Sequence, residues 1–443
     1  MRRKIDIHYV TRVEGHGNIK VSLQDGKIEE CRWEVSEAPR FFEAIVVGRK
    51  WYEMHHITSR ICGICSVAHQ LASLKATENA FGVEVSDQTV RLRKILLDGE
   101  NIQSHILHVG YLVLPDLLGM GSIIPLASVN KDELMRVIKI HRLANQICEI
   151  IGGRTTHPVR CVVGGFCALP TEDELKMVKD KFVQILSELQ FFAELLEGFL
   201  PKFPDFERET EYIGLTNGTE YALYEGDIGS TDTGKTGVEN YLEVTNEYVV
   251  PHSTAKFTKH ARDSYMVGAL ARFNLNHEKL LHRAKAVAEM LGLRPVCTNP
   301  YMNSVAQLVE SVHSAENSIK LIDEVLDAGL KDEIVDEESS NIPVRAGRGI
   351  GAVEAPRGIL FHDYEYDSSG TCVKANCVIP TNQNHANIQK DMEELVPKIA
   401  HLPEEDIKLA LEMLVRAYDP CISCSTHYIE VKFTSSTNQK NCH

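Results

Sequence analysis

The fold of this chain is organised around two stretches: Asp419-Pro420-Cys421-Ile422-Ser423-Cys424-Ser425-Thr426-His427, near the C-terminus, and Arg60-Ile61-Cys62-Gly63-Ile64-Cys65, near the N-terminus. Each contains a Cys-x-x-Cys pair. Two thiolates at this spacing can chelate one soft or borderline metal ion, so the two pairs predict a four-thiolate site built from both ends of the chain. A single pair is weak evidence, because a structural zinc knuckle or a redox disulfide has the same spacing.

The residues around the second pair point to a reactive site. Asp419 precedes Cys421 by two positions and His427 follows Cys424 by three. A carboxylate and an imidazole beside thiolates are proton carriers, which are more typical of a reactive centre than of an inert zinc site. The two pairs also lie much too far apart for a zinc ribbon or finger, so a metal between them requires a folded protein around it.

Composition narrows the class of protein. The 443 residues are 43% hydrophobic and 25% charged, without a long uncharged apolar run, which favours a globular protein without a membrane span. The net charge of -15 disfavours nucleic acid as a partner. Asp6 and His8 interrupt the place where a secretory signal needs its apolar core, so we expect a cytoplasmic protein, unless it is exported on the signal of a partner. Of the twelve cysteines, most outside the two pairs should be buried apolar residues.

Hydrophobic periodicity predicts a mainly helical α+β protein. Alternating apolar residues on both sides of Gln24-Asp25-Gly26 indicate a β-hairpin, and hence a β-rich part over about 1–37. Between positions 203 and 273 we expect short strands and loops, and at 354–358 and 378–382 loops. The helices should form a central bundle with small peripheral antiparallel β elements; they are predicted at 66–81, 86–114, 130–151, 171–199, 276–291, 303–328 and 403–417.

Four polar residues stand out by their surroundings. Glu14 lies among glycines at the end of a strand, where it is either a solvated turn residue or a functional carboxylate. Glu43 has apolar neighbours, so it either faces solvent or is buried and paired, for which a hard cation is suitable. Arg357, between a proline and a glycine, is held on a rigid turn and can aim its donors inward. His69, one helical turn beyond Cys65, could donate a hydrogen bond to sulfur.

Six motifs together carry a resemblance to a known family. They occur in the order found in the large, catalytic subunit of nickel-iron hydrogenases, which the chain resembles over essentially its whole length. The motifs are Arg-Val-Glu-Gly-His at 12–16, Arg-Phe-Phe-Glu at 40–43, Arg-Ile-Cys-Gly-Ile-Cys-x-x-x-His at 60–69, Gly-Gly-Arg-x-x-His-Pro at 152–158, Glu-Ala-Pro-Arg-Gly at 354–358 and Asp-Pro-Cys-x-x-Cys-x-x-His at 419–427.

The resemblance implies the fold of that subunit and a bimetallic centre. Cys62, Cys65, Cys421 and Cys424 would ligate nickel, and Cys65 and Cys424 would also bridge to an iron that carries carbon monoxide and cyanide. Such a centre cleaves dihydrogen heterolytically and reversibly.

Four further residues acquire roles through the resemblance. Glu14 would relay protons from the terminal thiolate of Cys421. Arg357 would lie over the open metal site near the diatomic ligands, and Thr381 would donate to a cyanide. His69 would be hydrogen-bonded to a bridging sulfur.

The resemblance also implies a magnesium ion and a processing site. Glu43, the backbone carbonyl of Cys377 and His427 would hold the magnesium. Residues 1–427 would form the hydrogenase domain, and a maturation endopeptidase would remove the extension 428–443 once nickel is loaded. Alternatively, this chain matures without cleavage.

Electrons would leave through an iron-sulfur small subunit, because the chain has no further recognisable iron-sulfur ligands. The sequences at 37–43 and at Gln103-Ser104-His105 resemble those of the cytoplasmic branch of this family. Members of that branch work with flavin and iron-sulfur subunits and with NAD(P), ferredoxin or another soluble carrier. At Ser104 the membrane-bound uptake enzymes tend to carry aspartate. The alternatives are a hydrogen-sensing regulatory hydrogenase, the related quinone-site subunit of respiratory complex I, and a structural zinc protein.

Overall fold

The structure is a computed structural model that describes residues 2–25, 27–336 and 342–426. Its helices are α1 (Phe42–Val46), α2 (Trp51–Thr58), α3 (Ser66–Phe81), α4 (Asp87–Ile106), α5 (Leu114–Leu118), α6 (Leu126–Val129), α7 (Lys131–Gly152), α8 (Glu172–Glu197), α9 (Tyr241–Val244), α10 (Ala269–Asn276), α11 (His282–Met290), α12 (Asn303–Ala328), α13 (Pro380–Ile399) and α14 (Glu404–Ala417). Short turns of other helix types are η1 (Ser59–Ile61), η2 (Leu107–Val113), η3 (Leu200–Lys202), η4 (Val238–Asn240), η5 (His277–Lys279), η6 (Pro300–Met302) and η7 (Ser423–Ser425).

The strands form several small sheets. A three-stranded antiparallel sheet has the order β1 (Arg2–Ile7), β2 (Gly17–Gln24), β3 (Lys27–Val35), and another has the order β12 (Gly347–Ala355), β13 (Gly358–Tyr366), β14 (Cys372–Val378). A four-stranded sheet runs β11 (Tyr265–Met266), β6 (Glu211–Thr216), β7 (Asp227–Ser230), β8 (Gly234–Thr236), with β11 parallel to β6. The two-stranded sheets pair β9 (Asn246–Tyr248) with β10 (Phe257–Lys259) and β4 (Cys161–Val162) with β5 (Gly165–Phe166).

Long helices form a bundle on one side of the molecule, as the periodicity predicts. α4 packs against α7 and α12, and α8 packs against the same two helices. The start of α8 is fixed by a capping box in which Thr171 and Glu174 bond each other's backbone N–H. Its buried face repeats at helical intervals and consists of Leu175, Val178, Phe182, Ile185, Leu186, Leu189, Phe192, Ala193 and Leu196. The predicted fold class is therefore confirmed.

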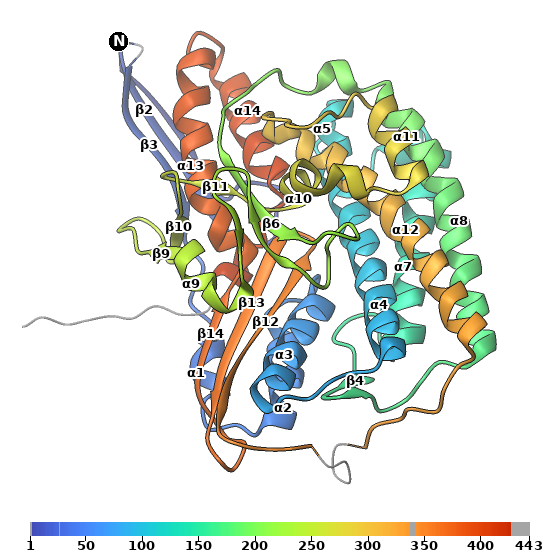
Figure 1. Ribbon diagram of the computed structural model, residues 1–443. Coiled ribbons are helices and arrows are strands. Elements are labelled where there is room, and N and C mark those ends of the chain that lie inside the picture. Colours follow the sequence, from blue (N-terminus) through green and yellow to red (C-terminus); the bar gives the residue numbers. More distant parts are fainter. Residues whose placement is uncertain (1, 26, 337–341, 427–443) are drawn as a thin grey trace, which may run out of the picture.

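The sheet β12–β14 is the feature that sequence patterns missed. Strands β12 and β13 are largely buried, and β12 lies along α3 in the middle of the molecule (Figure 1). Alternate glycines of β12 face α3: a Cβ added to Gly349 or Gly351 would collide with the backbone of Ala76 or Ala72. The helix can approach the strand this closely only because both surfaces carry small residues.

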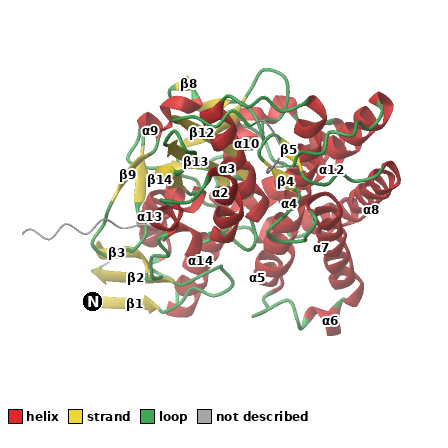
Figure 2. Ribbon diagram, turned by 90° about the horizontal axis from the view of Figure 1, so that it is seen from below, coloured by secondary structure: helices red, strands yellow, loops and turns green. Residues whose placement is uncertain are grey.

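Described segments from the N-terminal and C-terminal parts of the chain lie side by side. β3 packs against α13, where the indole of Trp33 donates to His385 Nδ1 at 2.9 Å (Figure 2 shows the β1–β3 sheet at the edge of the molecule). From there the N-terminal loop reaches the segment after α14, and Glu14 forms a bridge with Cys421. Gly15 has a φ of +82°, and a Cβ there would lie 2.8 Å from Ile422 Cβ, so this contact requires glycine.

The outcome differs among the predicted elements. The hairpin around 24–26 and the helices at 66–81 and 303–328 are confirmed. The helix expected at 276–291 is wrong in its bounds, because α10 ends at Asn276 and a separate helix, α11, begins at His282. The stretch 354–358 is a tight turn between two strands, and 378–382 joins β14 directly to α13, so neither is an extended loop.

The helix predicted at 86–114 is interrupted. After α4 the backbone follows a π-helix, η2, and then continues as α5. Such π-type turns occur frequently at functional sites. None of the helices in the described part of the chain is long and apolar enough to cross a membrane.

We expect Gly351→Ala to destabilise the protein by about 2–3 kcal/mol, since the added methyl group must push the backbone of α3 away from β12. Thermal melting of the purified protein measures this effect. The matched control is Gly218→Ala, because no described atom lies within 4 Å of a Cβ at that position. Equal melting temperatures for the two variants would contradict the close approach of α3.

Candidate metal centre

The four cysteines of the two pairs meet in the interior. Cys62 follows η1, Cys65 is the N-cap of α3, and Cys421 and Cys424 follow α14. The Sγ atom of Cys421 lies 3.7 Å from that of Cys62 and 2.7 Å from that of Cys424. Among the described residues, these three form a group of potential metal ligands whose sulfur atoms all lie within 4.8 Å of one another. Cys65 adjoins them, since its N–H donates to Cys62 Sγ at 3.0 Å.

The four thiols do not ionise equally. Burial opposes ionisation of Cys62, but hydrogen bonds with the thiols of Cys421, Cys424 and Cys65 outweigh it and hold the pKa of Cys62 well below its usual value. The hydrogen bond with Cys421 raises the pKa of Cys65, and the bond with Cys424 raises that of Cys421. A bound cation is what would allow all four to ionise.

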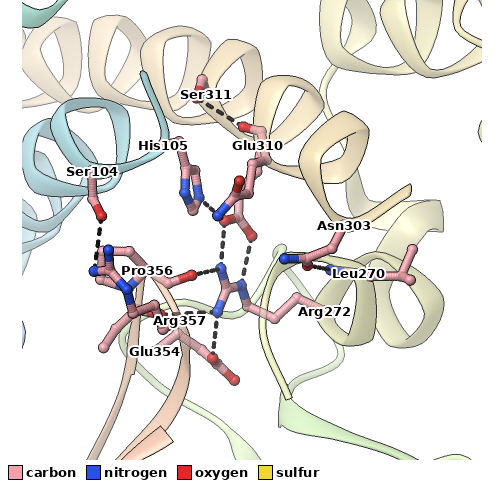
Figure 3. Close-up of polar contacts among 12 residues, drawn as sticks. Ser104, His105, Leu270, Arg272, Asn303, Glu310, Ser311, Glu354, Pro356 and Arg357 are labelled. Carbon is pink, nitrogen blue, oxygen red and sulfur yellow. Dashed lines mark hydrogen bonds and ion pairs between the residues drawn. The ribbon is translucent and has the colours of Figure 1, made fainter. Parts of the chain in front are cut away.

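Arg357 provides the positive charge beside the thiols. It lies at the tip of the β12–β13 turn and is 4% exposed. Burial opposes its charge, but the charge of Asp419 and interactions with the cysteine sulfurs of residues 421, 65 and 62 raise the pKa of Arg357 well above its usual value. Its Nε donates to the Asp419 carbonyl at 2.6 Å, and another nitrogen donates to the carboxylate at 2.7 Å. The third nitrogen donates to Ser104 Oγ at 3.3 Å (Figure 3).

Asp419 and its partners complete this edge of the site. Asp419 Oδ2 accepts from Gln307 Nε2 at 3.0 Å, and Gln307 Oε1 lies 2.5 Å from His108 Nδ1. The position of Asp419 in the Asp-Pro-Cys motif indicates such proximity, but Gln307 belongs to a distant helix and has no local signal. His105 contacts Glu310, and His108 contacts Gln307.

The carboxylate of Glu14 lies beside the second cysteine pair. It accepts hydrogen bonds from the N–H of Ser423, at 3.0 Å, and from the Ser423 hydroxyl. Ser423 lies between Cys421 and Cys424, and Glu14 is half-buried. The structure therefore brings Glu14 from the N-terminal loop to the edge of the thiol cluster, where it borders both the interior and the surface.

Thr381 lies at the start of α13 and is buried against Cys421. Its Oγ1 accepts a hydrogen bond from the Cys421 N–H at 3.0 Å. The hydroxyl proton is still available for donation to another acceptor in the site.

His69 is one turn along α3 from Cys65 and fully buried. Its Nδ1 lies 3.0 Å from Nε2 of His362 on β13, and His362 Nδ1 contacts the hydroxyl of Tyr364. A partner on one ring nitrogen fixes the orientation of the imidazole. His362 was not predicted as a site residue.

Glu100 is another buried group that the sequence did not reveal. From α4 it accepts hydrogen bonds from the N–H groups of Val67 and Ala68, at 2.6 and 2.9 Å, in the first turn of α3. Burial raises the pKa of Glu100 to about 8. It holds the end of the helix that carries Cys65.

Two of the three predicted magnesium contacts are close together. Glu43 is 6% exposed, and its Oε1 accepts from the Cys377 N–H at 2.8 Å. His427 lies outside the described residues, as does the extension 428–443. The carbonyl of Thr426, the residue before His427, accepts a hydrogen bond from the Arg40 N–H at 2.7 Å, so the chain approaches the helix that carries Glu43.

The donor set fits the metals that the resemblance implies. Soft thiolates suit nickel, iron and zinc. The charged and hydrogen-bonding groups around them, Arg357, Asp419 and Glu14, are those of a reactive centre with a proton path. The carboxylate of Glu43 suits a hard cation such as magnesium.

Comparison with known proteins identifies the family. The family model for nickel-dependent hydrogenase matches residues 40–130 and 195–427, and a model described as HoxL-like matches residues 4–38. The chain is 33% identical to sulfhydrogenase 1 subunit alpha of Pyrococcus furiosus, covering 96% of this chain and 98% of the relative. It is 31% identical to sulfhydrogenase 2 subunit alpha of the same organism, covering 96% and 100%.

Solved structures agree in fold. An NAD+-reducing NiFe hydrogenase in its hydrogen-reduced state matches with a TM-score of 0.84 and 27% identity, covering 96% of this chain and 99% of that chain. A Ni-Fe-Se hydrogenase from D. vulgaris Hildenborough has the same fold, with a TM-score of 0.76. The chain belongs to the nickel-dependent hydrogenase family, and it is the catalytic large subunit of a nickel-iron hydrogenase, an oxidoreductase.

Proposed function

We propose that this subunit cleaves dihydrogen reversibly and heterolytically at a nickel-iron centre held by Cys62, Cys65, Cys421 and Cys424. The observation that carries the proposal is the convergence of these thiols in the interior, each 5% exposed or less, beside the guanidinium of Arg357. All four cysteines would hold the nickel, and Cys65 and Cys424 would also hold the iron, which would carry carbon monoxide and cyanide. When bound, the centre polarises dihydrogen and accepts its electrons.

Arg357 and Thr381 shape the space around the centre. Arg357 is held on both sides, by Asp419 and by Ser104, so that its charge stays fixed beside the thiolates. Thr381 Oγ1 accepts the hydrogen bond of the Cys421 N–H, and its hydroxyl would donate a hydrogen bond to a cyanide ligand of the iron. The burial of both side chains excludes water from the reacting groups.

Glu14 carries protons between the site and the surface. In this proposal its carboxylate takes the proton from the thiol of Cys421 and releases it toward solvent. What supports the role is the position of Glu14 against Ser423 and its partial exposure. His69, oriented by His362, would donate a hydrogen bond to a sulfur that holds the iron, and so lower the negative charge on that sulfur.

Magnesium binds next to this region in the proposal, held by Glu43, the carbonyl of Cys377 and His427. The contact between Glu43 and the backbone of Cys377 supports it. Residues 1–427 form the mature domain, and an endopeptidase removes residues 428–443.

The electrons pass to an iron-sulfur small subunit, then through flavin and iron-sulfur subunits to a soluble acceptor in the cytoplasm, such as NAD(P) or ferredoxin. Two likenesses support this assignment. One is to an NAD+-reducing NiFe hydrogenase, and the other is to proteins named as alpha subunits of sulfhydrogenases.

We expect Cys62→Ser to lose most bound nickel and all hydrogen turnover, because a hydroxyl is a poor ligand for a soft site. Metal analysis by mass spectrometry and a dye-linked hydrogen assay on the native complex measure both. Cys167→Ser is the control, since Cys167 is exposed and lies outside the two pairs. Full nickel content in Cys62→Ser, or zinc in place of nickel in the unmodified protein, would contradict the proposal.

We expect Glu14→Gln to slow hydrogen–deuterium isotope exchange by roughly 10²–10⁴-fold while nickel content stays unchanged, because the amide keeps the bonds to Ser423 but cannot accept a proton. Glu174→Gln is the matched control: this carboxylate also accepts from a backbone N–H, but in the capping box of α8. Exchange at the unmodified rate in Glu14→Gln would remove Glu14 from the proton path.

Intact-mass analysis of the native complex tests the processing and partner assignments together. We expect the nickel-loaded large subunit to end at His427 and to copurify with a chain that carries iron-sulfur clusters. A nickel-loaded, active chain that still contains residues 428–443 would show that maturation needs no cleavage.

A further inference from the structure

A second arginine, Arg272, lies directly behind the turn that carries Arg357. It belongs to α10, is fully buried, and uses all five of its N–H donors (Figure 3). Two donate to the carboxylate of Glu310, both at 2.6 Å, and one donates to Glu354 at 2.8 Å. The last two donate to backbone carbonyls, those of Ala355 at 3.0 Å and Pro356 at 2.9 Å.

These two carbonyls belong to the residues immediately before Arg357. The turn contains no other residue than Pro356 and Arg357 between the paired ends of β12 and β13, at Ala355 and Gly358. A short turn is positioned by its few backbone contacts, and here a rigid, planar guanidinium binds two successive carbonyl groups of it. The direction in which Arg357 leaves the backbone is therefore set by Arg272.

The partners of Arg272 are themselves fixed from several elements. Glu310 on α12 also contacts His105 Nε2, at 2.6 Å, and accepts from the hydroxyl of Tyr221, at 3.0 Å. Glu354 accepts from the Leu215 N–H at 2.6 Å. The carboxylates and the guanidinium are fully buried, so water does not compete for their hydrogen bonds.

The same group of residues is also connected to the side chain of Arg357. Ser104, which accepts from Arg357, precedes His105 on α4, and His105 contacts Glu310. The backbone of Arg357 is thus tied to Arg272 and its side chain to Ser104, and both connections lead to Glu310 (Figure 3). Ordinary core packing does not require such a connection, and buried ion pairs contribute little net stability compared with apolar residues of similar size.

We propose that Arg272 is a positioning residue, which, anchored by Glu310, holds the 355–358 turn so that the guanidinium of Arg357 faces the metal-binding thiols. The inference rests on the proposed role of Arg357 in hydrogen cleavage. Lysine at position 272 would keep a positive charge opposite Glu310, but its single ammonium group cannot bind both carboxylates and both carbonyls.

The test compares Arg272→Lys with Arg93→Lys in the native complex. Arg93 is an equally buried arginine. Two of its nitrogens donate to the carboxylate of Glu78, and one also donates to the carbonyl of Val162, but it does not touch the turn. We expect Arg272→Lys to raise amide hydrogen exchange in the peptide that covers 354–358, and to lower turnover per bound nickel on the order of 10²-fold. Infrared bands of the iron-bound ligands should shift. Arg93→Lys should leave all three unchanged.

The outcomes separate this inference from the proposed function. If Arg357→Lys is inactive but Arg272→Lys has unmodified exchange at the turn and unmodified turnover per nickel, Arg272 has no positioning role. Full turnover in Arg357→Lys would instead refute the role of Arg357 itself. Where Arg272→Lys does not accumulate, Glu310→Gln removes the charge that anchors Arg272 at nearly constant volume. It should show the same changes in smaller degree, and unmodified exchange and turnover there would overturn the inference.

Discussion

The contact between two cysteine pairs from opposite ends of the chain is the constraint on which the structure depends. Four cysteine side chains lie together where water hardly reaches them, so any negative charge that they carry must be compensated by nearby groups. Arg357 supplies a fixed positive charge, and the N–H groups of Ile64 and Cys65 donate to Cys62. The remaining compensation has to come from the metal that the family binds.

Holding the pairs together requires close packing of the elements that carry them. The first pair begins α3, which lies on β12 through alternate glycines and is held at its first turn by Glu100. The second pair follows α14 and is fixed from the N-terminal loop by Glu14 and by the close approach at Gly15. Because α3 and β12 touch backbone to backbone, a small displacement of either would shift the positions of the cysteines.

Buried charges then orient the side chains around the centre. Arg357 is tied to Asp419, Asp419 to Gln307, and the turn behind Arg357 to Arg272. Each of these groups is satisfied by hydrogen bonds from a different element, so the side chains around the site are held in place by the protein itself. Such preorganisation is what a reaction with developing charge needs, and it explains why many polar groups lie in the interior of this subunit.

The sequence by itself determined the family, the cysteine pairs and the helices with strong periodicity, such as 66–81 and 303–328, because motif spacing and an apolar helical stripe are local properties. It did not reveal the β12–β14 sheet, since the glycines of β12 are selected by contact with α3 and break the alternation of a strand. Nor did it reveal α13, whose first turns are polar yet buried. Only the tertiary structure brought Arg272, Glu310 and Arg357 together, because the pairing of buried charges depends on which distant elements are neighbours in space.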